Sequence, residues 1–360
     1  MQYKNQIIEL PQNRVWRSYQ GGLILDRLAG KTPCDGHYPE DWIGSVTAAK
    51  NPDSQDANEG ISKVELDGQQ ILLPELIAMD PDYFLGPEHV ARFGQQPMLL
   101  VKLLDSAVRL QLQAHPTATF AQRHLNSNSG KAEAYYILDI RDDVGQAYVH
   151  LGFQRPPARE DFQRWIQDQD MDSIMECFDR IEVQRGDVLF IPGGVPHAIG
   201  EGILMVEIME PSDLVVRFEF ECAGYTLPES ARFMNRGLDF CMDIFDFDAM
   251  PEERIRKEFM FSPKLETTYN DDSKRYNLIG PETTSCYRVK KSVIRGVVER
   301  EDSEFYIGVV TDGACTVKTD QQQIELRKFD KFYCPAGVGS VTIEAQEEVQ
   351  ILECFPPIRK

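Results

Sequence analysis

Hydrophobic and polar residues alternate in several stretches of the chain, and a repeat of two residues predicts β-strands. β-Branched and aromatic residues are frequent over residues 96–153, and the same composition recurs in DVLFIPGG, ILMVEIME and DLVVRFEFE. A last alternating stretch covers residues 288–355. The pattern therefore predicts a mainly β protein with two β regions.

Two stretches of the chain have the spacing of helices instead of strands. Residues 155–180 carry apolar positions that suit two short amphipathic helices, and Pro228 stands where it can open a second helical stretch over 228–259. We therefore expect a first β domain with a helical insert, a helical connecting segment and a second β domain. Their predicted bounds are 1–228 with the insert at 155–180, 229–265, and 266–360.

A short internal repeat links the two β regions. Residues 192–199 read PGGVPHAI and residues 335–342 read PAGVGSVT, each after a short hydrophobic run. His197 aligns with Ser340. If the barrel is duplicated, only the first copy offers an imidazole to a metal ion, so we expect the second domain to be metal-free.

Composition narrows the possible partners. With 360 residues, 42% of them hydrophobic, the chain can form two cores, and its net charge of −20 argues against nucleic acid or an anionic membrane as a partner. No apolar run approaches the roughly 20 residues of a membrane span, the first residues do not resemble a signal peptide, and the eight cysteines are scattered. We expect a cytoplasmic protein with reduced thiols.

The stretch LQLQAHP has two interpretations. Its alternation places Gln111, Gln113 and His115 on one polar face of a predicted strand. Such a face often meets solvent, and a single histidine on it is then only hydrated. The other interpretation is a metal site, because an amide oxygen and an imidazole are both metal ligands.

Further motifs decide between the two interpretations. In GDVLFIPGGVPHAIG, a Pro/Gly turn after a strand projects His197 towards a barrel mouth, with the spacing of the second motif of cupin barrels. Together with LLVKLLD, LQLQAHP, GKAEAYYILD and SDLVVR, in this order, it resembles the type I mannose-6-phosphate isomerases over most of the first 220 residues. The resemblance implies two cupin-type jelly-roll barrels with helical insertions between strands and between barrels.

The resemblance also implies one Zn²⁺ per chain, held by Gln113, His115, Glu133 and His197. Two imidazoles and one carboxylate suit zinc, and a neutral amide oxygen lowers the charge of the site. A water or sugar oxygen can then take an open position. The interpretation of LQLQAHP as a metal site is therefore the one we adopt.

Residues near these motifs are candidates for catalysis. Lys131 lies two residues before Glu133, on the same strand face. Alternation places Asp213 and Arg217 on one face, which also suits a structural ion pair. The resemblance assigns Lys131, Arg217, Glu207 and Asp213 to the catalytic pocket. Lys102 is a weaker candidate for phosphate contact, and Gln111 is a candidate for substrate contact. Trp42 has either a core role or a sugar-stacking role.

Some positions do not follow the family pattern. Gln111 stands where the family commonly has a serine that helps to hold the substrate phosphate, Val46 stands near a common histidine, and Glu219 and Glu221 add negative charge after Arg217. The remaining histidines match no ligand motif; they are His37, His89, His124 and His150.

The resemblance implies a cytoplasmic enzyme of carbohydrate metabolism, an intramolecular oxidoreductase. It would interconvert mannose 6-phosphate and fructose 6-phosphate through an enediol, with a small-molecule sugar phosphate as its partner. Two alternatives stay open at this point: a metal-binding, sugar-sensing cupin without turnover, and an isomerase of another sugar or sugar phosphate. Glu207, Asp213 and Lys131 each qualify as the group that moves the proton.

Overall fold

The computed structural model describes residues 3–51, 56–66 and 68–358, and their strands form three large antiparallel sheets and two hairpins. The nine-stranded sheet contains β1 (Ile8–Glu9), β18 (Lys264–Asn270), β19 (Ser273–Ile279), β20 (Arg288–Glu301), β21 (Tyr306–Asp312), β22 (Ala314–Lys318), β23 (Gln323–Arg327), β24 (Lys331–Cys334) and β25 (Ser340–Phe355). The prediction of a mainly β protein is confirmed.

The other sheets come from the first part of the chain. The seven-stranded sheet has the order β17 (Met260–Phe261), β11 (Val188–Ile191), β8 (Glu133–Ile140), β13 (Ile203–Met209), β6 (Leu100–Asp105), β3 (Glu40–Ile43) and β2 (Arg14–Val15). The five-stranded sheet has the order β10 (Ile181–Glu182), β9 (Tyr148–Leu151), β12 (His197–Ile199), β7 (Gln113–Ala114) and β14 (Val216–Arg217). The hairpins are β4 (Lys63–Leu66) with β5 (Gln69–Leu72) and β15 (Glu221–Cys222) with β16 (Tyr225–Thr226).

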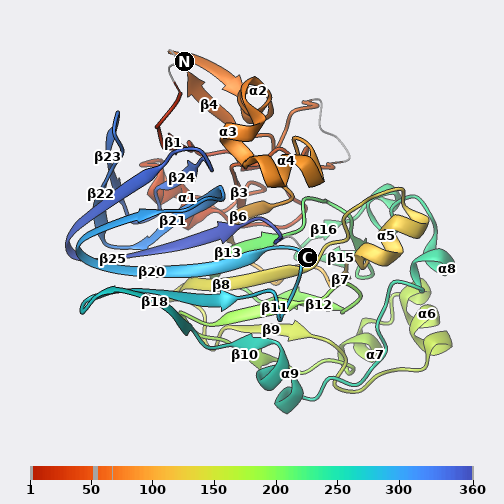
Figure 1. Cartoon of the computed structure of the whole chain (residues 1–360). Helices are drawn as coiled ribbons and strands as arrows, with labels where there is room; N and C mark the ends of the chain where they lie inside the picture. Colours follow the sequence, from red (N-terminus) through yellow and green to blue (C-terminus); the bar gives the residue numbers. More distant parts are fainter. Residues whose placement is uncertain (1–2, 52–55, 67, 359–360) are drawn as a thin grey trace.

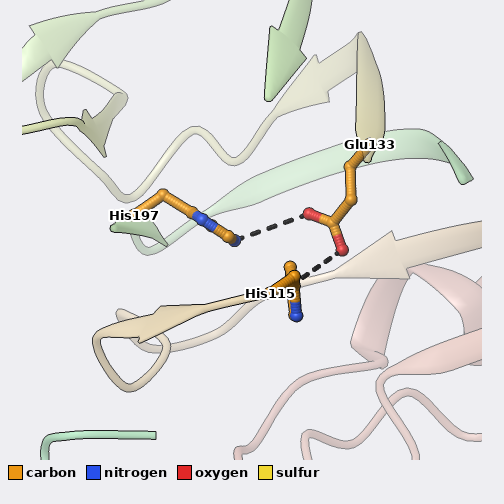
Figure 2. A group of neighbouring side chains, drawn as sticks. All are labelled: His115, Glu133 and His197. Carbon is orange, nitrogen blue, oxygen red and sulfur yellow. Dashed lines mark ion pairs between the residues drawn. The ribbon is translucent and has the colours of Figure 1, made fainter. Parts of the chain in front are cut away.

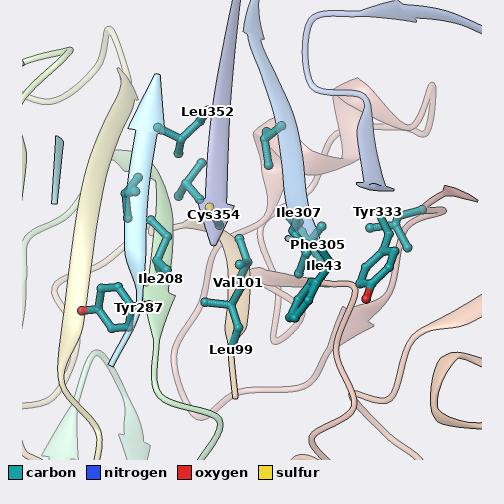
Figure 3. Packing of buried hydrophobic residues seen from close by; sticks show 14 of the residues in the cluster. Ile43, Leu99, Val101, Ile208, Tyr287, Phe305, Ile307, Tyr333, Leu352 and Cys354 are labelled. Carbon is teal, nitrogen blue, oxygen red and sulfur yellow. The ribbon is translucent and has the colours of Figure 1, made fainter. Parts of the chain in front are cut away.

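The seven-stranded sheet is the middle layer of the molecule. Tyr136 and Leu138 of β8 belong to the core that it shares with the nine-stranded sheet, which Figure 3 shows from close by. Tyr135 and Ile137, which alternate with them, belong to the core that it shares with the five-stranded sheet. Because both faces are covered, β8 and β13 are apolar almost throughout, and a polar residue on them lies in the interior.

Short helices surround the sheets (Figure 1). They are α1 (Leu23–Leu28), α2 (Leu73–Met79), α3 (Pro81–Leu85), α4 (Pro87–Phe93), α5 (Ala118–His124), α6 (Arg159–Asp168), α7 (Met171–Met175), η1 (Glu229–Ala231), α8 (Leu238–Cys241) and α9 (Glu252–Glu258). The predicted pair of helices in the insert is confirmed as α6 and α7, whose Phe162, Ile166 and Ile174 are buried against the five-stranded sheet and its loops.

The prediction of a helical stretch over 228–259 is only partly correct. The segment forms the 3₁₀ turn η1 and the short helices α8 and α9, because Gly237 and Pro251 interrupt it. The phenylalanine-rich loop between α8 and α9 is held by packing, since Phe245 contacts Phe162 and Phe218. The helices α2, α3 and α4 were absent from the prediction, although each has a proline at its start.

The internal repeat has a structural counterpart. Each copy follows a short strand, β11 or β24, and leads into the next strand, β12 or β25, of which His197 and Ser340 are the first residues. The turns differ in detail: the first has a positive φ of 92° at Gly194, whereas in the second the positive φ of 79° falls two positions later in the repeat, at Gly339. His197 is buried, whereas Ser340 is exposed and donates to Glu299.

Two short strands pair with sheets that are formed mainly by the other part of the chain. Strand β1 pairs with β24 of the nine-stranded sheet, and β17 pairs with β11 of the seven-stranded sheet. A buried ion pair of Lys331 with Asp41 also links the two layers. The division at 228 and 265 stays a prediction. Among the described residues, no helix is long and apolar enough to span a membrane.

Candidate metal centre and its pocket

Three buried side chains, from the seven-stranded and the five-stranded sheet, converge at one point (Figure 2). His197 begins β12 and His115 follows β7 in the five-stranded sheet, while Glu133 begins β8 in the seven-stranded sheet. Glu133 Oε1 lies 3.0 Å from His115 Nε2, and Glu133 Oε2 lies 3.5 Å from His197 Nε2. The ligand atoms of the three residues all lie within 4.8 Å of one another. This is the spacing of a candidate metal site.

Backbone contacts fix the orientation of both rings. His115 Nδ1 lies 2.8 Å from the carbonyl oxygen of Leu214, and His197 Nδ1 lies 2.9 Å from that of Val195. A carbonyl only accepts, so each Nδ1 carries the proton and each Nε2 presents a lone pair to the site. Metal-binding histidines are commonly oriented in this way.

Gln113 meets the same centre from the neighbouring strand. It is the register partner of His197, and its amide nitrogen lies 3.4 Å from His197 Nε2. A half-turn of the amide exchanges its nitrogen and oxygen, so that the oxygen faces the ligand atoms. The predicted ligand set of Gln113, His115, Glu133 and His197 is thus brought together, and its role stays a prediction.

The charge of the site suits a cation. The Lys131 ammonium lies 2.8 Å from Glu133 Oε1 and 3.2 Å from His115 Nε2. Burial, and next the charge of Lys131, lowers the pKa of His115 to about 3, so this imidazole is neutral and free to ligate. Burial acts to raise the pKa of Glu133, but Lys131 outweighs it and holds the pKa well below its usual value. The donor set therefore fits a zinc ion.

Glu133 also has spare bonding capacity. Its Oε1 is buried and makes no hydrogen bond of good geometry with any described residue, despite the contact with Lys131. Because an unsatisfied buried carboxylate oxygen is costly, this atom needs a further partner. A metal ion between Glu133 and the two rings would be such a partner.

Backbone hydrogen bonds fix the segment that immediately precedes β8. Glu210 accepts from the backbone nitrogens of Gly130 and Ala132 at 3.1 and 3.0 Å, and the Lys131 nitrogen donates to the Pro116 carbonyl at 3.0 Å. The backbone on both sides of Lys131 is therefore fixed relative to the strand that carries His115. These hydrogen bonds aim Lys131 and Glu133 at the same point.

Two connected pockets open beside the candidate metal centre. The inner pocket is lined by Gln111, Gln113, Lys131 and Glu207, among others. The outer cavity measures about 610 Å³ and is walled by Trp16, Lys50, Tyr225 and Arg236, among others. Both are lined by Arg17, Asp213, Val215 and Arg217. The inner pocket, which includes Gln113 and Lys131, measures only about 30 Å³, so the outer cavity is the space with room for a small substrate.

Arg217 lies where the two pockets meet. No described carboxylate forms an ion pair with it, and its guanidinium donates only to the Ala231 carbonyl, at 3.2 Å. Burial lowers the pKa of Arg217 from its ordinary value. The alternative of an Asp213–Arg217 ion pair is wrong, because Asp213 instead contacts Arg17 at 3.2 Å. Arg217 is thus available to an anion.

The other predicted pocket residues are held in a buried network. The Lys102 ammonium lies 3.3 Å from both Glu40 and Glu207. Burial raises the pKa of Glu207 to about 8, with Lys102 acting against the shift. Burial also acts to raise the pKa of Asp213, but the charge of Arg17 dominates and brings it to about 2. Lys102 is therefore engaged by carboxylates, whereas Glu207 holds a proton near neutral pH.

Gln111 is buried in the inner pocket. It is 3% exposed, its Oε1 accepts from Ser18 at 3.4 Å, and its Nε2 has no described partner. The predicted strand through Gln111, Gln113 and His115 is shorter than expected, since β7 covers only Gln113–Ala114. The solvated interpretation of His115 is wrong, because its side chain is 1% exposed.

Sequence reasoning missed part of the pocket. Arg17 donates to Glu40 at 2.8 Å, and Tyr19 donates to the other oxygen of Glu40 at 2.6 Å. Trp42 is fully buried between Arg17 and Lys102, so its core role is confirmed and it does not face a sugar. The charged pair of Glu40 and Asp41 within a buried strand was the signal that was overlooked.

The remaining histidines lie apart from the centre. His37 stacks on Trp16, His89 contacts Phe93, and His124 contacts Phe120. His150 is buried on β9, where its Nδ1 lies 2.8 Å from the Asp179 carbonyl. In the described part of the chain, none of the four belongs to the group with metal-ligand spacing.

Fold and site together define a mainly β protein with a candidate His/Glu/His metal centre beside a pocket. No family model matches the chain. The mannose-6-phosphate isomerase ManA of Bacillus subtilis is 24% identical over 257 residues, which are 71% of this chain and 74% of ManA. The crystal structure of the mannose 6-phosphate isomerase from Bacillus subtilis has a TM-score of 0.72 and 21% identity, covering 96% of this chain and 99% of that chain.

A mannose 6-phosphate isomerase structure bound with zinc and yttrium has a TM-score of 0.70 and 15% identity, covering 98% of this chain and 100% of that chain. In sequence the chain is thus similar to mannose-6-phosphate isomerases over about three quarters of its length, and in fold over nearly all of it. The resemblance noted in the sequence is therefore confirmed.

Proposed function

We propose that the protein is a zinc-dependent aldose–ketose isomerase that interconverts mannose 6-phosphate and fructose 6-phosphate. The observation that carries the proposal is the buried group of His115, Glu133 and His197 beside a pocket in which Arg217 has no carboxylate partner among the described residues. The activity named for ManA, a relative of this chain, supports the choice of substrate. One substrate thus accounts for both the candidate metal ligands and the cation beside them.

The metal ligands in this proposal are His115, Glu133 and His197, completed by the amide oxygen of Gln113. Bound zinc supplies a Lewis acid that polarises the sugar oxygens. The chain orients both imidazoles through their Nδ1 contacts, so that the Nε2 lone pairs converge. Two nitrogens and one carboxylate as donors support the choice of zinc, and a mannose 6-phosphate isomerase of similar fold has a structure bound with zinc and yttrium.

Glu207 is the proposed group that moves the proton between C1 and C2. Isomerisation through an enediol needs one group that takes a proton and returns it, and such a group works best when its pKa is near the working pH. Glu207 lines the inner pocket, and burial raises its pKa to about 8. Asp213 is less suited, because Arg17 holds its pKa at about 2.

Arg217 and Lys131 stabilise negative charge in this proposal. A net charge of −20 repels a phosphorylated substrate, so nearby cations have to bind it. The guanidinium of Arg217 offers paired donors to phosphate or enediolate oxygens. Lys102 contributes less, since it already contacts Glu40 and Glu207.

An isomerase of another sugar is the second candidate, and one observation favours it. Gln111 Nε2 is buried in the inner pocket without a described partner, and an amide donor suits a neutral hydroxyl as well as a phosphate. A coupled assay over a panel of sugar phosphates and free sugars decides. Mannose 6-phosphate should give the highest kcat/KM; a better free sugar points to the second candidate, and binding without product points to a sugar sensor.

A further inference from the structure

The two oxygens of Glu133 have different surroundings. Oε1 faces His115 and Lys131, at 3.0 and 2.8 Å. Oε2 faces His197 at 3.5 Å and accepts a hydrogen bond of 2.6 Å from the hydroxyl of Tyr135. Figure 2 shows the carboxylate between the two rings, with one oxygen directed to each. The phenol therefore holds the oxygen on the His197 side.

Tyr135 reaches Glu133 because both lie on one strand. They are two residues apart on β8, so they share the face directed at the five-stranded sheet. Tyr135 is 1% exposed, and Glu133 is the acceptor that the structure gives its hydroxyl. The next residue, Tyr136, points to the opposite face, where its hydroxyl accepts from Lys291 at 3.1 Å.

The hydrogen bond from Tyr135 restrains the last side-chain torsion of Glu133, which has only weak preferences of its own. The last torsion of a glutamate has broad preferences, so the carboxylate plane is set by its hydrogen bonds more than by the side chain itself. With Oε2 tied to Tyr135, the plane is fixed so that Oε1 points between His115 and Lys131. Groups that orient a metal-binding carboxylate in this manner raise the affinity of the site.

We propose that Tyr135 is a positioning residue of the metal centre, whose hydroxyl fixes the Glu133 carboxylate and thereby sets the affinity for the metal. The inference rests on the metal-binding part of the proposed function and not on the identity of the sugar. In this proposal the hydroxyl of Tyr135 acts on the metal centre, whereas its ring does not. The ring belongs to the apolar core between the seven-stranded and the five-stranded sheet.

The test is the zinc dissociation constant of Tyr135→Phe, measured by competition with a chelator. Because a phenyl ring fills nearly the same space as a phenol, the variant should fold, and thermal unfolding of the metal-free proteins checks this. We expect zinc binding about 10- to 100-fold weaker than in the parent. The matched control, Tyr136→Phe, removes a buried hydroxyl from the adjacent position and should leave the zinc affinity unchanged.

A second readout separates positioning from loss of stability. The visible spectrum of the Co²⁺-loaded protein, at saturating metal, should differ between Tyr135→Phe and the parent, because the carboxylate donor changes its orientation. Zinc affinity within twofold of the parent and an unchanged Co²⁺ spectrum would overturn the inference alone. A parent chain that binds neither metal would overturn the inference together with the proposed function.

Discussion

Two buried glutamates, one in each half of the molecule, have opposite pKa shifts. Glu353 of the nine-stranded sheet contacts Arg275, Arg300 and Ser292, and although burial acts to raise its pKa, Arg275 leads the groups that lower it to about 2. Glu207 of the seven-stranded sheet shares the ammonium of Lys102 with another carboxylate, and burial raises its pKa to about 8.

The difference distinguishes a buried charge that supports the fold from one that is left available for chemistry. In the network around Glu353 every charge is paired, since two guanidinium groups neutralise the carboxylate and also contact Asp302, and only Arg300 Nε among the atoms of these four side chains lacks a hydrogen bond of good geometry. Around the candidate metal centre, the buried Glu133, Glu207 and Gln111 each keep an atom without a hydrogen-bond partner among the described residues. Open bonding capacity next to a pocket is the mark of the functional half.

The largest effect on zinc content and turnover is expected at His197, whereas the matching position of the second repeat copy, Ser340, should have none. His197→Ala should lose bound zinc and with it several kcal/mol of transition-state stabilisation, on the order of 10³-fold in turnover. Ser340→Ala, at the matching position, should keep one zinc per chain and full activity. Metal analysis and turnover of both variants check this. Equal zinc content in the two variants would remove the functional contrast between the copies.

The second prediction concerns the charged network of Glu353 with Arg275 and Arg300. Glu353→Gln leaves Arg275 and Arg300 buried without a full counter-charge and should lower the free energy of unfolding by about 3–5 kcal/mol. Zinc affinity should not change, because the network lies in the other half. Urea unfolding measures the loss, with the exposed Glu347→Gln as a control that should stay within about 0.5 kcal/mol of the parent. A weakened metal site in Glu353→Gln would mean that the two halves are coupled.

The third prediction concerns Arg217, whose guanidinium forms no ion pair with a described carboxylate. In Arg217→Lys an ammonium cannot reproduce the paired donors of a guanidinium, so we expect a loss of about 2–4 kcal/mol of transition-state stabilisation with fold and zinc content retained. The control is Arg232→Lys, at a residue that lines neither pocket and whose guanidinium donates to the Leu227 carbonyl. Steady-state kinetics with mannose 6-phosphate decide, and parent-like turnover in Arg217→Lys would contradict the assignment.

The smallest effect concerns pH. In the folded metal-free protein Glu207 keeps its proton up to about pH 8, whereas an unfolded glutamate releases it near its ordinary pKa of 4.5. Between these values the folded state binds more protons, so this group makes the protein less stable as pH rises. Glu353 has the opposite sign, and its contribution is lost only as pH falls from 4.5 through about 2.

Glu207→Gln should therefore remove a loss of stability on the order of 2 kcal/mol between roughly pH 5 and roughly pH 7. Urea unfolding of the metal-free parent and variant across that range provides the measurement, and the difference between their slopes isolates the contribution of Glu207. Parallel slopes would show that burial does not raise the pKa of Glu207, which would remove the reason for preferring it to Asp213 as the proton-transfer group.

The sequence was most informative where the relevant residues lie close together along the chain. Gln113 and His115, Lys131 and Glu133, and the turn before His197 are short motifs, and the structure brings all of them to one point. The strand pattern and the helices of the insert are likewise local.

Contacts between distant residues were not predictable in this way. Asp213 and Arg217 share a predicted strand face, yet Asp213 is paired with Arg17, which lies 196 residues away. Arg17 and Glu40 come from loops and strands near the start of the chain, where no motif connected them with the site. Alternation also suggested solvent beside His115, because the pattern does not reveal that a second sheet covers that face.

The central claim is that turnover depends on one metal ion held by His115, Glu133 and His197. The most direct measurement removes metal with a chelator, returns zinc in steps, and follows the conversion of mannose 6-phosphate to fructose 6-phosphate. Turnover should rise in proportion to added zinc and reach its plateau at one zinc per chain. Full turnover before zinc is added, or tight binding of zinc and sugar phosphate without product, would contradict the claim.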